Sequence, residues 1–211
     1  MKLYFNPISP NCRRAVMTAV HLGLPVEEKP IDFTKGDHKT PAFLAMNPNG
    51  MIPTLTDGDF SLWESRAIMQ YLASKKPEAG LLGKNERERA DVSRWLFWDS
   101  SHLARHMGTI LFETFVKKVM NMGSPDASAI AAAREQLKRF YPVLDASLKG
   151  RKYLVGDALT IADLGIASTF TYADMIGERV DAYPNIKSWL GRIAALDCWK
   201  KTQPQLPAAA E

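Results

Sequence analysis

The chain has 211 residues, of which 46% are hydrophobic and 24% are charged, and its formal net charge is +4. These values are typical of a folded globular protein and exclude collagen-like, disordered and disulfide-rich classes. No apolar run approaches the ~18 residues that a membrane-spanning helix needs, and the start, MKLYF, lacks the pattern of a signal peptide. We therefore expect a cytoplasmic protein that has no membrane partner.

The charged and sulfur-containing residues point to no nucleic acid and no metal. Lys and Arg are scattered along the chain in a way typical of solvated helix faces, although a mild preference for small anionic ligands stays open. Cys12 and Cys198 are the only cysteines, and neither belongs to a metal-type pair. The sequence thus predicts neither a structural zinc nor a disulfide framework.

The first 76 residues mix strand and helix patterns. A strand at 3–5, a helix that ends at Gly23 and an extended piece at 27–31 form a β-α-β unit. Thr40 and Pro41 begin a short helix that ends near Asn47. The Asp57-Gly58 turn then predicts a hairpin, which a helix from about residue 65 to 74 follows. This order predicts a small four-stranded α/β domain.

Beyond a linker at residues 77–84, the pattern is helical almost throughout. Helix starts are indicated at Asn85, Ser124, Thr160 and Tyr183, and Thr160 with Asp163 forms a capping-box pattern. The last eight residues, PQLPAAAE, are expected to be poorly ordered. We therefore predict a domain at residues 1–76, the linker, and an all-helical domain at residues 85–211.

The turn between the first strand and the first helix carries Ser9, Pro10, Asn11 and Cys12. Redox proteins of this topology have C-x-x-C there, with the first thiol activated by the helix N-terminus. With Ser9 in that place, a hydroxyl can donate a hydrogen bond to the thiolate of a bound ligand. Helix capping is the other role open to Ser9. Cys12 falls on the apolar side of the helix, where we expect it to be buried.

Two further stretches predict contacts to a peptide-like ligand. In NPNGMIPTL, a cis Ile52–Pro53 bond would leave the Ile52 backbone able to pair with an extended ligand, whereas a trans proline at a sheet edge is the alternative. At Glu64-Ser65 a strand runs into a helix, whose N-terminus attracts a carboxylate while Glu64 suits an ammonium group. Glu-Ser before a helix is also an ordinary cap.

Together these features fit a ligand with a thiol, an extended backbone and an amino-acid head. Here the sequence resembles the cytosolic glutathione transferase family, over nearly all its length, in LYFNPISPNCRRAV, HKTPAFLAMNPNGMIPTL, LWESRAIMQYL and LVGDALTIADLGIAS. Its serine is similar to that of the theta- and delta-like classes and of bacterial relatives. The resemblance implies an α/β thioredoxin-like N-terminal domain, an all-α C-terminal domain, and a homodimer that uses glutathione as co-substrate.

The resemblance also implies roles for individual residues. Ser9 would stabilise the glutathione thiolate. Asn11 is unusual beside Ser9, and its own side chain could share that contact. Met51, Ile52 and Pro53, the family's cis-proline, would lie along the cysteinyl backbone, and Glu64 and Ser65 would hold the γ-glutamyl end. His38 would approach the glycyl carboxylate, although Gly50 stands where delta-like members often have another histidine. The Thr160 and Asp163 pair would serve folding.

The second substrate would meet the helical domain. Asp99, His102 and His106 are spaced at i, i+3 and i+7, so they share a helix face. Polar contacts at the surface or between helices are the alternative for all three. Two histidines and one acid do not imply a metal.

Three functions stay open at this level. The first is an enzyme that joins glutathione to small electrophilic, mostly hydrophobic substrates by attack of the bound thiolate. The second is a glutathione-dependent isomerase, dehalogenase or peroxidase on the same fold. The third is a binding or regulatory protein without turnover, against which the intact set of Ser9, Ile52, Glu64 and Ser65 argues.

Overall fold

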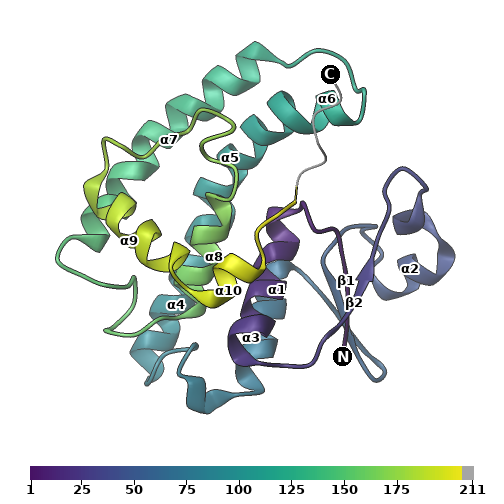
Figure 1. Cartoon of the computed structure of the whole chain (residues 1–211), viewed down its shortest axis with the longest axis horizontal. Coiled ribbons are helices and arrows are strands. Elements are labelled where there is room, and N and C mark those ends of the chain that lie inside the picture. Colours follow the sequence, from purple (N-terminus) through teal and green to yellow (C-terminus); the bar gives the residue numbers. More distant parts are fainter. Residues whose placement is uncertain (206–211) are drawn as a thin grey trace. The chain divides into compact units, whose positions relative to one another are not determined.

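A computed structural model of the chain describes residues 1–205 and divides into two compact units (Figure 1). One unit comprises residues 1–82 together with the described residues from Ala195, and the other comprises residues 83–194. Of the tail that was predicted to be poorly ordered, residues 206–211 lie outside the described part.

The N-terminal unit is built on a four-stranded mixed sheet. Its order is β2-β1-β3-β4, with β2 parallel to β1 and both β3 and β4 antiparallel to their neighbours. The strands are β1 (Lys2–Phe5), β2 (Glu27–Pro30), β3 (Thr54–Asp57) and β4 (Phe60–Trp63). Leu3 and Leu55 face each other in register and are almost completely buried. The predicted hairpin is confirmed.

Helices pack on both sides of this sheet. Helices α1 and α3 pack against each other on one face, and α2 lies on the other side (Figure 1). Their bounds are α1 (Pro10–Leu22), α2 (Pro41–Met46) and α3 (Ser65–Ser74), with 3₁₀ turns at Asp37–Lys39 and Pro77–Ala79. Gly23 ends α1 in the left-handed conformation, at φ 61°, and Thr40 caps α2 by accepting a hydrogen bond from the Phe43 N–H at 3.3 Å.

The C-terminal helix α10 (Asp197–Lys201) lies with the N-terminal unit. It packs against α1, where Arg13 stacks over the Trp199 ring at 3.7 Å and donates to the Trp199 carbonyl at 3.0 Å. These contacts change one part of the predicted organisation. The described residues from Ala195 group with the N-terminal unit instead of with the helical domain predicted at residues 85–211.

The other unit is entirely helical within its described residues. Its helices are α4 (Glu86–Trp98), α5 (Ala104–Leu111), α6 (Lys117–Val119), α7 (Ala127–Leu148), α8 (Ile161–Thr169) and α9 (Pro184–Ala194), with π-helical segments at Asp99–Leu103 and Phe112–Val116. Asn85 caps α4 as predicted, but α7 begins later than Ser124 because Asp126 supplies its cap. No helix among residues 1–205 is long and apolar enough to cross a membrane.

A buried carboxylate organises the core of the helical unit. Asp163 forms the predicted capping box with Thr160 at the start of α8. It also accepts hydrogen bonds from the Leu154 N–H and from the Trp189 indole N–H, both at 2.9 Å. The sequence pattern had indicated only the local cap. The observed fold, a thioredoxin-like α/β unit followed by helices, confirms the predicted fold class.

Candidate functional site

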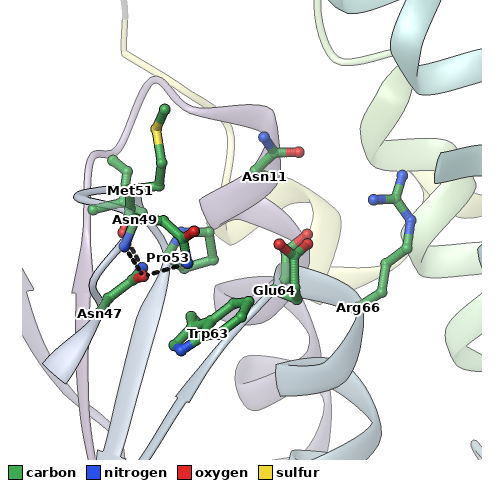
Figure 2. A pocket seen from close by; sticks show the side chains of 10 residues that line it. Asn11, Asn47, Asn49, Met51, Pro53, Trp63, Glu64 and Arg66 are labelled. Atoms are coloured by element: carbon green, nitrogen blue, oxygen red, sulfur yellow. Dashed lines mark hydrogen bonds between the residues drawn. The ribbon is translucent and has the colours of Figure 1, made fainter. Parts of the chain in front are cut away.

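The N-terminal unit contains a cavity of about 430 Å³. Three segments surround it: the start of α1, the loop between α2 and β3, and the junction of β4 with α3 (Figure 2). The lining residues are Asn11, Asn47, Asn49, Met51, Ile52, Pro53, Trp63, Glu64, Ser65 and Arg66. Six of these had been predicted as site residues: Asn11, Met51, Ile52, Pro53, Glu64 and Ser65.

Asn47 holds the loop before β3 in shape. Its buried side chain donates to the Met51 carbonyl at 2.7 Å and to the Thr54 hydroxyl at 3.0 Å, and it accepts from the Asn49 N–H at 3.0 Å. The Ile52–Pro53 peptide bond is cis, as predicted. Among the described residues, no hydrogen bond engages the Ile52 N–H or carbonyl. Both groups can therefore pair with an extended ligand.

The opposite wall is the junction of β4 with α3. Glu64 has φ 72°, which is uncommon for a residue other than glycine, and its side chain is exposed. The Glu64 side chain makes no capping hydrogen bond at the N-terminus of α3, and Ser65 is the first residue of that helix. The site therefore combines a helix N-terminus, which favours an anion, with an adjacent carboxylate, which favours a cation.

Ser9 lies next to this cavity in sequence but is not among its lining residues. Its hydroxyl oxygen accepts a hydrogen bond from the Cys12 N–H at 3.4 Å, so it caps α1. A hydroxyl that accepts a bond keeps its own proton to donate. Cys12 is fully buried, as expected, and burial raises the pKa of its thiol to about 11. This thiol stays protonated near neutral pH and is a poor nucleophile.

His38 is placed beside the cavity loop without lining the cavity. Its ring packs on Phe33 in a tilted arrangement, with centroids 4.3 Å apart and an interplanar angle of 31°, and its Nδ1 is buried with no hydrogen-bond partner among residues 1–205. Gly50 adopts φ 60°, and a Cβ there would lie 3.2 Å from the His38 carbonyl oxygen. A histidine at position 50 would therefore strain the loop in its present conformation.

The residues predicted for a second substrate lie in the helical unit. Asp99 is completely buried and accepts a hydrogen bond from the Thr169 hydroxyl at 2.8 Å. His102 and His106 both stack on Phe140, with ring centroids 4.7 and 5.9 Å away. The predicted common face is confirmed for the two histidines, whereas the Asp99 carboxylate serves a contact between helices. Burial holds the pKa of His106 below its ordinary value.

Four lining residues were missed by the sequence reasoning: Asn47, Asn49, Trp63 and Arg66. Two of them occur in NPNG and two flank Glu64-Ser65, so adjacency to the predicted ligand contacts was the available signal. Asn47 in particular contributes by holding its own loop in shape, and no periodic pattern in the sequence reveals such a role. In the described part of the chain, no group of three or more His, Cys, Asp or Glu side chains is arranged to hold a metal ion.

Comparison with known proteins agrees with this architecture. Residues 1–74 match the model of the glutathione S-transferase N-terminal domain, and residues 103–197 match that of the C-terminal domain. Glutathione S-transferase 3 of Zea mays is 38% identical over 98% of this chain and 95% of its own length. The probable glutathione S-transferase GSTF2 of Oryza sativa subsp. japonica is 38% identical over 90% of this chain and 89% of its own.

The solved structure of a relative has the same fold. Glutathione S-transferase I from maize, in complex with an atrazine glutathione conjugate, superposes with a TM-score of 0.87 at 34% identity, covering 96% of this chain and 95% of that one. These relatives are plant proteins, and they do not support the theta- or delta-like or bacterial assignment expected from the sequence. On the two domain matches and the near full-length identity, the chain belongs to the glutathione S-transferase family.

Proposed function

We propose that the protein joins the thiolate of glutathione to small electrophilic, hydrophobic substrates. The observation that carries this proposal is the cavity of the N-terminal unit, where the free Ile52 backbone faces a helix N-terminus and a carboxylate at Glu64 and Ser65. A peptide with an amino-acid head matches that pairing of groups. Family membership, and a relative whose structure holds a glutathione conjugate, support the same conclusion.

The three parts of glutathione have distinct proposed contacts. The cysteinyl backbone pairs with the N–H and carbonyl of Ile52, between Met51 and Pro53. The γ-glutamyl carboxylate meets Ser65 and the α3 N-terminus, while its ammonium group meets Glu64. His38 remains our prediction for the glycyl carboxylate, supported by its buried Nδ1 that has no partner among residues 1–205.

Ser9 is the proposed catalytic residue. Its oxygen is already engaged by the Cys12 N–H, so the hydroxyl proton is the group left to face a ligand. Donation to the sulfur favours the thiolate over the thiol and lowers the pKa of the bound thiol. The sulfur then attacks the electrophilic carbon with its lone pair, forming a C–S bond as the leaving group departs with the electron pair of the bond that breaks.

The electrophile is proposed to contact the helical unit. His102 and His106 present stacked, partly exposed rings, which suit an apolar or aromatic substrate. Asp99 is a weaker candidate because its carboxylate is buried and already bonded to Thr169. The contribution of this unit to the substrate site stays a prediction for all three residues.

We also propose that two copies form a homodimer in the cytoplasm. Strand β4 is a sheet edge, and its Phe60 and Trp63 are 44% and 39% exposed. Exposed aromatic side chains on an unpaired edge strand are typical of a surface that a partner covers. Sedimentation of the purified protein tests the dimer, and a single species of monomer mass would contradict it.

The function is tested by binding and turnover in one preparation. Calorimetry with millimolar reduced glutathione should show binding, and a chlorodinitrobenzene should be conjugated with release of chloride. Absence of binding contradicts the whole proposal. Binding without conjugation, followed by turnover with a peroxide or a halogenated or isomerisable substrate, would favour an alternative reaction. Binding without any turnover would favour a non-catalytic glutathione-binding protein.

A further inference from the structure

Asn11 lines the glutathione cavity from the first turn of α1, and its side chain is exposed (Figure 2). Figure 2 shows Asn11 apart from both the Asn47 loop and Trp63, so it forms a separate wall of the cavity. Ser9, the proposed catalytic residue, lies two positions earlier and is engaged as a helix cap. The cavity therefore has a polar side chain near the predicted sulfur position besides the serine.

Arg14 determines which end of the Asn11 amide is free. The Arg14 guanidinium donates a hydrogen bond from Nη1 to Asn11 Oδ1. A guanidinium carries only donors, so it selects the carbonyl end of the amide. No described residue accepts a hydrogen bond from Asn11 Nδ2. The two N–H bonds of that nitrogen are consequently available to a ligand.

Arg14 is also well held. Only 1% of its surface is exposed, and its backbone carbonyl accepts from the Thr18 hydroxyl at 2.8 Å within α1. The Arg14 charge also acts on the Cys12 thiol in the same turn. Burial raises the pKa of that thiol, and the positive charge of Arg14 lowers it. A buried, ordered cation of this kind can fix a neighbouring amide without loss of side-chain entropy on ligand binding.

We propose that Arg14 is a positioning residue that directs the Asn11 side-chain N–H toward the sulfur of bound glutathione, so that Asn11 acts as a second donor to the thiolate beside Ser9. This inference rests on the proposed function. The thiol proton leaves to solvent on ionisation, and no covalent bond to the protein forms. Two donors aimed at one sulfur favour its charged form more than a single donor does.

The test measures the pKa of bound glutathione from thiolate ultraviolet absorbance, together with the pH profile of kcat/KM. Asn11→Ala is the decisive variant, because it removes the donor without adding charge. Asn11→Asp keeps an oxygen for Arg14 but removes the donor and adds a negative charge that by itself disfavours the thiolate, so both effects act together in that variant. For Asn11→Asp we expect the pKa of the bound thiol to rise by about one to two pH units, with turnover near neutral pH falling about tenfold for each unit. Asn11→Ala should cause a smaller rise in the same direction.

Cys12→Ala is the matched control in the same helical turn, and it should leave the pKa of the bound thiol near that of the wild type. If Asn11→Ala keeps the wild-type pH profile, Asn11 is no donor and the inference fails. If wild-type protein does not bind glutathione, the proposed function fails as well. Binding and conjugation by the wild type, with Asn11 variants unchanged, overturns this inference alone.

A double-mutant cycle separates positioning by Arg14 from a direct effect of its charge. Arg14→Met should raise the pKa of the bound thiol in the wild-type background and change it little in Asn11→Ala, because the residue it positions is absent. Equal shifts in both backgrounds would overturn the positioning role. Should Arg14→Met fail to fold, Arg14→Lys is used in the same cycle, and the Asn11→Ala result stands independently.

Discussion

The two units of this protein use their polar groups in opposite ways. Around the cavity of the N-terminal unit, polar groups are left available: the Ile52 backbone, the Asn11 amide nitrogen and the Glu64 carboxylate. In the helical unit, the buried carboxylates of Asp99, Asp163 and Glu178 are bonded to other polar groups, whereas the buried Trp95 indole N–H has no partner among residues 1–205. Asp163 alone accepts from Thr160, Leu154 and Trp189.

Other contacts in the helical unit follow the same rule. Arg134 and Glu178 form an ion pair at 2.8 Å, and the Tyr141 hydroxyl contacts Glu178 at 3.5 Å. Asp145 accepts from the Asn185 and Ile186 N–H groups at the start of α9. Because an unpaired buried polar group is costly, these networks stabilise the fold, whereas unpaired groups at a cavity are reserved for a ligand. Substitutions should therefore reduce stability in one unit and ligand binding in the other.

The largest effect, a loss of stability, is expected for Asp163→Ala. The change leaves the Leu154 N–H and the Trp189 indole N–H without an acceptor and removes the Asp163 half of the α8 capping box, the bond from the Thr160 N–H. Since each unsatisfied buried group costs about 1–3 kcal/mol, the free energy of unfolding should fall by about 3 kcal/mol or more. Urea unfolding followed by circular dichroism measures it. Asp157→Ala, at an exposed position, is the control and should change little; equal stability of the two variants would contradict the role of Asp163.

Ser9→Ala is expected to have the next largest effect, on chemistry. Loss of one hydrogen bond to the charged sulfur is worth about 1.5–3 kcal/mol, so the pKa of the bound thiol should rise by about one to two pH units. Glutathione affinity should change less than turnover near neutral pH. The pH–rate profile, measured beside that of Asn11→Ala with the same electrophile, gives the result.

Thr40→Ala is a control that separates the helix-capping role of Ser9 from its proposed contact with the thiolate. Thr40 caps α2 through the same kind of bond that Ser9 makes at α1, but it does not line the cavity. Both variants should lose about 0.5–2 kcal/mol of stability. Only the Ser9 variant should alter the pH profile. If Ser9→Ala keeps the wild-type profile and Asn11→Ala loses it, the thiolate contact belongs to Asn11 alone.

Much of this could be predicted because the signals are local. The Gly23 stop, the Thr40 cap, the Asp57-Gly58 turn and the Thr160–Asp163 capping box each specify their element from neighbouring residues. Contacts between distant segments have no such signature. The packing of Trp199 on Arg13, which brings α10 to the N-terminal unit, joins residues 186 positions apart. The bonding of Asp99 to Thr169 likewise spans 70 positions.

The site was predicted in part for the same reason. Ile52, Glu64 and Ser65 belong to short motifs whose backbone geometry follows from proline and from a helix start. Asn47 was missed because its role, holding Met51 and Thr54 in place, depends on how the loop folds back on itself. Helix periodicity placed Asp99 with His102 and His106, but a π-helical segment at Asp99–Leu103 changes the local spacing.

Ser65→Ala should weaken glutathione binding about tenfold while leaving the pKa of the bound thiol unchanged, since Ser65 is assigned to the γ-glutamyl end, away from the sulfur. Calorimetry gives the affinity, and thiolate absorbance gives the pKa. Ser61→Ala, in the middle of β4 and outside the cavity lining, is the matched control. A shifted pKa with unchanged affinity would reverse the assignment of Ser65.

The smallest effect is expected at Asp57, a surface residue of the N-terminal unit. Hydrogen bonds from Lys75, at 3.0 Å, and from the Tyr71 hydroxyl, at 2.8 Å, hold the pKa of Asp57 below its ordinary value of 3.8. Because the folded pKa is the lower one, this stabilisation is present above the unfolded value and is lost as the pH falls through the folded value. The stability difference between wild type and Asp57→Asn should therefore shrink on acidification below about pH 4.

Urea midpoints of both proteins, measured from about pH 6 to about pH 3, test this expectation. Asp181→Asn is the counterpart in the helical unit, where Lys187 at 2.7 Å lowers the pKa of a more exposed carboxyl: the Asp181 side chain is 62% exposed and that of Asp57 31%. Exposed pairs are screened by solvent and contribute little in either unit, so the two variants should behave alike. A stability difference that grows on acidification would contradict the assigned direction. A much larger effect in one unit would show that the contrast between the units extends from buried groups to their surfaces.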